Sequence, residues 1–113
     1  MIVVRILRNS SSGIMGFEAS GHAGYAHYGH DIVCSAVSAL CIAIANGLQR
    51  HCSTPVNVDT ADGYMRVVSL PESGGGEIDN SSKVLYHTLV DALKEIAEQY
   101  PDRLSVITDS DES

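Results

Sequence analysis

The side chains best suited to chemistry lie in one short stretch, residues 21–38. Three of the five histidines and one of the three cysteines fall within it: His22, His27, His30 and Cys34. A cysteine with a nearby imidazole base can attack a carbonyl carbon, whereas several histidines with a cysteine can also bind zinc. The stretch therefore indicates either acyl transfer or a metal site.

Cys34 is the candidate nucleophile because of its place in a predicted helix. Asp31 is a typical N-cap residue, and an apolar run with helical spacing follows it directly. Cys34 would then lie in the first helical turn, where unpaired backbone N–H groups and the helix dipole stabilise the thiolate, the nucleophilic form. Ser38 follows one turn later on the same face and could bond near the site or to the Cys34 carbonyl. The competing interpretation of Cys34 is a small buried hydrophobic residue.

His22 is the candidate base. It lies where the second predicted strand ends, and the glycine-rich segment from Gly21 to His30 can return it to the start of the helix. A base must come within ~3 Å of the thiol, and Asp31 could orient its imidazole as well as cap the helix. The competing interpretation of His22 is a surface histidine in a loop. His27 and His30, in the same loop, are weaker candidates.

The rest of the chain predicts the elements that position this stretch. Apolar runs separated by turn residues predict five strands, and two runs with helical spacing predict two helices. The expected strands are Ile2–Leu7, Ile14–Ser20, Pro55–Asp59, Tyr64–Leu70 and Leu104–Thr108, and the expected helices follow Asp31 and run from Asp79 to Tyr100. The order ββαββαβ predicts an α+β fold, with two helices on one face of a mixed, mostly antiparallel sheet.

The spacing of apolar residues also predicts which face of each helix is buried. On the first helix the core stripe is Val33, Val37, Leu40, Ile44 and Leu48, and on the second it is Val84, Leu85, Leu89, Leu93 and Ile96. The first helix has small apolar residues on its other side as well: Ala36, Ala39, Ala43 and Ala45. We therefore expect it to be covered on most sides, by the sheet and by the second helix or a partner subunit.

Length and charge limit the classes of function. At 113 residues, 44% hydrophobic and 19% charged, the chain fits one globular domain, residues 1–108, followed by an acidic tail at 109–113. The formal net charge of −7 disfavours direct binding to nucleic acid and favours a basic partner or peptide.

The cysteines and the apolar runs indicate the compartment. An odd number of cysteines without a Cys-x-x-Cys pair argues against a disulfide framework, and we interpret Cys41 and Cys52 as structural. Arg5 and Arg8 interrupt the first apolar run, so no secretory signal is expected and the cytoplasm is the default. The apolar stretch from Ile32 to Ala45 is shorter than the ~20 residues needed to cross a bilayer, which predicts a buried helix and no membrane.

The pieces Gly21-His22-Ala23 and Asp31-Ile32-Val33-Cys34, followed by Ser38, resemble the ribosomal-processing cysteine protease family (Prp, or YsxB-like). The likeness extends over nearly the whole chain. It implies a catalytic dyad of His22 and Cys34 within a pattern that includes Gly21, Ala23, Asp31 and Ser38. It further implies a homodimer without a cofactor, whose peptide substrate is the N-terminal extension of a large-subunit ribosomal protein, cut after an aromatic residue. Ser35 stands where the family pattern has alanine, and His27 and His30 have no match.

Two other functions stay open. His22, His27, His30 and Cys34 could be ligands of a zinc ion, although their spacing is looser than in most structural zinc sites. Alternatively, the acidic surface could bind a ribosomal protein without cutting it. A zinc assay on protein purified without a histidine tag tests the first possibility, and binding by a Cys34→Ala variant tests the second.

Overall fold

The described residues of the computed structural model, 1–9, 13–21, 32–72 and 76–109, contain five strands and two helices. In chain order they are β1 (Ile2–Asn9), β2 (Gly13–Ser20), α1 (Ile32–His51), β3 (Val56–Ala61), β4 (Tyr64–Ser69), α2 (Asn80–Gln99) and β5 (Leu104–Asp109). This is the predicted order, and β5 includes the first residue of the segment expected to be a tail.

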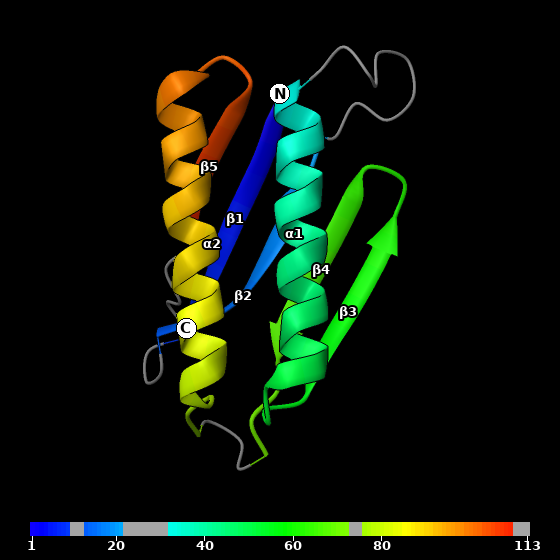
Figure 1. Ribbon diagram of the computed structural model, residues 1–113, viewed down its shortest axis with the longest axis vertical. Coiled ribbons are helices and arrows are strands. Elements are labelled where there is room, and N and C mark those ends of the chain that lie inside the picture. The colour runs from blue at the N-terminus through cyan, green and yellow to red at the C-terminus, as the bar shows by residue number, and fades with distance from the viewer. Residues whose placement is uncertain (10–12, 22–31, 73–75, 110–113) are drawn as a thin grey trace.

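The strands form one sheet in the order β3-β4-β2-β1-β5. The two hairpins and the β2–β4 pair are antiparallel, whereas β1 and β5 run parallel. Both helices lie on the same face of this sheet, with α1 over its middle and α2 toward the β5 side (Figure 1). The predicted α+β fold is therefore confirmed, including the mixed and mostly antiparallel sheet.

The core lies between the sheet and the two helices. Alternate residues of β1 face the helices, so Ile2, Val4 and Ile6 are buried. The register places Phe17 opposite Ile6 and Ala19 opposite Val4, and both are fully buried. On α1 the buried residues are Val33, Val37, Cys41, Ile44, Ala45 and Leu48. The predicted stripe of α1 is confirmed except that Cys41 takes the buried position expected for Leu40, which is partly buried.

The predicted stripe of α2 is confirmed at Leu89 and Leu93, is partly buried at Leu85 and Ile96, and is wrong at Val84. Val84 is 62% exposed, and the buried residues are Ser82, Tyr86, Leu89, Val90 and Leu93. Two of these residues, Ser82 and Tyr86, carry hydroxyl groups that form hydrogen bonds where they are buried. The hydroxyl groups of Tyr86 and Ser69 lie 2.6 Å apart, and the Ser82 hydroxyl donates to the Asp79 carboxylate at 2.6 Å. Counting only apolar residues gave no weight to Ser82 and Tyr86, and this turned the predicted stripe toward Val84.

Helix α1 is longer than the apolar stretch seen in the sequence. By length and composition alone it could cross a membrane. The central helix of a folded domain meets the same criteria, and Val33, Val37 and Leu48 of α1 are packed against the sheet. The expectation that no membrane is involved stays a prediction.

Candidate active site

The first turn of α1 carries the candidate nucleophile. The helix begins at Ile32, so Cys34 is its third residue, at a level where backbone N–H groups have no partner within the helix. Val33 and Val37 are buried against the sheet and fix this end of the helix. The Cys34 side chain is partly buried and partly accessible. The structure therefore combines a fixed backbone with a thiol that a substrate can reach.

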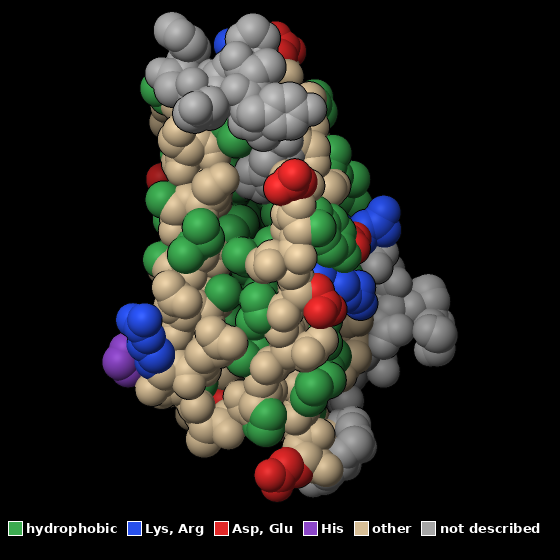
Figure 2. Space-filling model, turned by 90° about the vertical axis from the view of Figure 1, so that its right-hand side faces the viewer, with side chains coloured by type: hydrophobic (Ala, Val, Ile, Leu, Met, Phe, Trp, Pro, Cys, Tyr) green, Lys and Arg blue, Asp and Glu red, His purple; other side chains and the backbone are tan. Residues whose placement is uncertain are grey.

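Cys34 lies at a groove between α1 and the β3–β4 hairpin, here named the α1–β3 groove. The groove has a volume of about 440 Å³ and is lined by Cys34, Ser35, Ser38, Cys41 and Ile42 of α1 and by Thr60, Ala61, Gly63, Tyr64 and Met65 of the hairpin. Figure 2 shows a strip of hydrophobic side chains between the helix and the edge strand. Ser38, a candidate supporting residue, thus faces the same space as Cys34.

The two other cysteines differ from Cys34. Cys41 is 2% exposed, and burial raises the pKa of its thiol to about 12. A thiol that resists ionisation is a poor nucleophile, so Cys41 contributes shape to the groove and not reactivity. Cys52 is partly buried just beyond the far end of α1. The sequence-based interpretation of both as structural agrees with these positions.

Gly21 directly follows β2, which ends at Ser20. Ser20, its neighbour, pairs with Tyr64, which lines the groove. Gly21 has a φ of 86°, and a side chain there would collide with the carbonyl oxygen of Met1. Only glycine combines this backbone conformation with so close an approach. The position is therefore constrained by local geometry, whatever its role in the site.

Several predicted site residues lie outside the described residues: His22, Ala23 and Asp31, and also His27 and His30. The dyad of His22 and Cys34 accordingly stays a prediction. In the part of the chain that the structure describes, no group of three histidine, cysteine or acidic side chains could hold a metal ion. Three of the four ligands proposed for zinc are not in that part, so the metal assay stays the test.

The hairpin wall of the groove was missed from the sequence. Tyr64 contributes at the turn, but the register places its side chain with Glu18 on the sheet face away from the helices. There its hydroxyl group donates to the Glu18 carboxylate at 2.7 Å, and this bond raises the pKa of Tyr64. Ile42 and Met65 contribute apolar surface. The Asp62-Gly63 turn signal located this hairpin but gave no indication that it faces α1, because that contact depends on the sheet order.

Comparison with known proteins identifies relatives of this sequence and this fold. The family model for cysteine protease Prp matches residues 1–105. The ribosomal processing cysteine protease Prp of Bacillus subtilis (strain 168) is 31% identical over 109 residues, which cover 96% of this chain and 97% of that protein. Its counterpart from Staphylococcus aureus (strain Mu50) is 26% identical over 106 residues, covering 92% and 95%.

A solved structure has the same fold. The ribosomal processing protease Prp from S. aureus, in complex with a covalently linked product peptide, has a TM-score of 0.82 and 24% identity, and the match covers 96% of this chain and 100% of that one. At this identity the likeness establishes the fold, and the family assignment rests on the family model and the B. subtilis relative. The chain belongs to the cysteine protease Prp family.

Proposed function

We propose that the protein is a cysteine endopeptidase in which Cys34 is the nucleophile and His22 the base. The observation that supports this best is the place of Cys34, in the first turn of α1 and at one wall of a groove of about 440 Å³. Membership of a cysteine protease family agrees with it. The groove offers space for substrate side chains directly beside the thiol.

With these proposed roles the reaction is acyl transfer. His22 takes the thiol proton, and the sulfur of Cys34 attacks the scissile carbonyl carbon. Backbone N–H groups at the start of α1 stabilise the oxyanion that forms. His22 then donates its proton to the departing amine, leaving a thioester on Cys34. Water, deprotonated by His22, hydrolyses the thioester and restores the thiol.

For the substrate we propose the N-terminal extension of a large-subunit ribosomal protein. The curated relatives are named as ribosomal processing proteases, and the net charge of −7 suits a basic ribosomal protein. We further propose that the enzyme acts in the cytoplasm as a homodimer, as the family resemblance implies. Light scattering at assay concentration tests the dimer: a mass near 12.0 kDa for the particle would contradict it.

The decisive experiment is cleavage of the extended ribosomal protein, followed by intact mass. We expect Cys34→Ala and His22→Ala to abolish cleavage while retaining the fold, as monitored by circular dichroism. Cys52→Ser is the matched control, because it replaces a cysteine far from the groove, and it should cut at the wild-type rate. Retained cleavage by Cys34→Ala would refute the assignment. If wild-type protein and Cys34→Ala bind the substrate equally and neither cuts it, the protein is a binding module.

A further inference from the structure

β3 forms the outer edge of the sheet beside the α1–β3 groove. Its register places Ala61 opposite Tyr64 across a two-residue turn. In such a hairpin the pair next to the turn exchanges both backbone hydrogen bonds, and the bonded pairs then alternate along the ladder. The Leu70 N–H donates to the Pro55 carbonyl at 2.8 Å, so Pro55 and Leu70 belong to the same alternating set of bonded pairs as Ala61 and Tyr64. The N–H and C=O groups of Thr60 therefore point away from β4.

The same alternation applies to Val58 and Val56, so β3 presents three residues whose backbone groups face outward. Within the described ranges, β3 pairs with β4 and with no strand on its outer side. An edge of this kind is a template for an extended segment of another chain. Val58 is opposite Val67, which is fully buried beneath the helices, so the side chains of Val58 and Thr60 are on the helix-covered face.

The groove continues this edge toward the nucleophile. Thr60 and Met65 line it from the hairpin, and Cys34 and Ile42 line it from α1. An extended peptide alternates its side chains between the two faces of a sheet. Every second side chain of a peptide on the β3 edge would accordingly point toward α1. Ile42 is 49% exposed, and an apolar substrate side chain would remove it from water.

We propose that the substrate binds as an added strand along the outer edge of β3. Its backbone exchanges hydrogen bonds with Val58 and Thr60, and one apolar side chain occupies the α1–β3 groove next to Cys34. The inference rests on the proposed peptidase function and specifies how that site holds its substrate. Backbone pairing aligns the chain, and the groove selects among sequences.

The first test uses synthetic peptides that span the cut junction, each with one backbone N–H replaced by N-methyl. Pairing with β3 predicts that kcat/KM falls about tenfold at every second position and much less at the positions between. Losses without this alternation would overturn the proposal. The unmodified peptide is assayed in parallel, so its cleavage shows that the peptidase function survives such a result. An unmodified peptide that is never cut would overturn both.

The second test alters the protein. Thr60→Pro removes an outward N–H without removing a bond to β4, since proline is tolerated on that side of an edge strand. We expect KM to rise about tenfold, and less for Thr60→Ala, which keeps the N–H. If Thr60→Pro fails to fold, the N-methyl series decides.

A third test addresses the groove. Ile42→Gln should raise KM, whereas Val84→Gln, which changes an exposed residue on α2, should not. Equal KM values for these two variants would refute the groove assignment.

Discussion

The two ends of α1 are built for different purposes. At the C-terminal end, Arg50 and His51 lie in the last turn and complement the negative end of the helix dipole. The first turn, which carries Cys34, contains no acidic residue of the helix itself. Its positive potential is thus not offset by a side chain of that turn and is available to a thiolate or an oxyanion.

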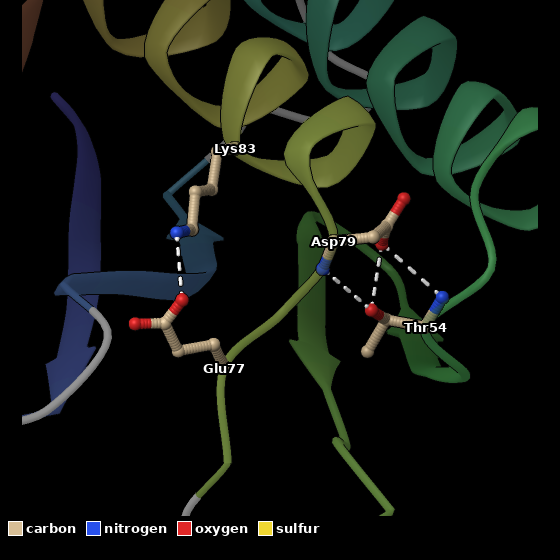
Figure 3. Close-up of polar contacts among 4 residues, drawn as sticks. All are labelled: Thr54, Glu77, Asp79 and Lys83. Atoms are coloured by element: carbon tan, nitrogen blue, oxygen red, sulfur yellow. Dashed lines mark hydrogen bonds and ion pairs between the residues drawn. The ribbon is translucent and has the colours of Figure 1, made fainter.

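The C-terminal end is also tied to the rest of the fold. The Asp79 carboxylate, just before α2, accepts hydrogen bonds from Thr54 N–H (3.2 Å) and Thr54 Oγ1 (2.6 Å), and the Asp79 N–H donates to Thr54 Oγ1 at 2.9 Å (Figure 3). The carboxylate also accepts from Ser53 N–H at 3.3 Å. These bonds join the segment after α1 to the start of α2. Polar bonds thus fix one end of the helix pair, and the other end presents reactive groups to a groove.

Alkylation should show the largest contrast along α1. We expect iodoacetamide to label Cys34 much faster than Cys41, two turns further on, with both identified by peptide mass mapping. With a pKa of about 12, only about one in ten thousand Cys41 thiols is ionised at pH 8, and burial shields it as well. Labelling of Cys41 at a rate equal to that of Cys34 would show that the groove does not distinguish the two.

Substitution of Gly21 tests the backbone beside the reactive end. Gly21→Ala should cost about 2 kcal/mol or more of unfolding free energy, since alanine both disfavours the positive φ and meets the Met1 carbonyl. Cleavage should fall too, because the chain leaves β2 beside the groove. Gly13→Ala is the control: its φ is 80°, but no atom lies within 4 Å of the added carbon, so about 1 kcal/mol is expected. Equal losses in urea unfolding would contradict the collision.

Much of this could be predicted from the sequence, because the signals are local. Turn residues and apolar periods gave the element order, and the cap position gave the place of Cys34 in the first turn. The α1–β3 groove could not be predicted, since Ile42 and Met65 meet only through the sheet order. The buried face of α2 was misjudged at Val84 because Tyr86 enters the core by pairing with Ser69, a contact between distant segments. The dyad partner His22 falls outside the described residues and stays a prediction.

Substitution of Asp79 should affect stability and leave the chemistry intact. Asp79→Ala removes the acceptor for Thr54 and Ser82, and we expect a loss of about 1.5 kcal/mol in urea unfolding. The cleavage rate, measured well below the unfolding midpoint, should stay at the wild-type value. Glu77→Gln is the control: its ion pair with Lys83 is solvent-exposed and should contribute little. A loss of cleavage in folded Asp79→Ala would show that the two ends of α1 are coupled.

The pH dependence of stability should reveal the same carboxylate, with a smaller effect. Desolvation opposes ionisation of Asp79, but the hydrogen bonds from Ser82 and Thr54 outweigh it and hold the pKa of the carboxyl well below its usual range. A lowered folded-state pKa stabilises the fold above the unfolded value near ~3.9, and this contribution is lost as pH falls below it. We therefore expect the difference in unfolding free energy between wild type and Asp79→Asn to be full at pH 6 and to shrink below about pH 4. A difference that stays constant or grows in acid would mean that the charge of Asp79 does not support this end of the helix pair.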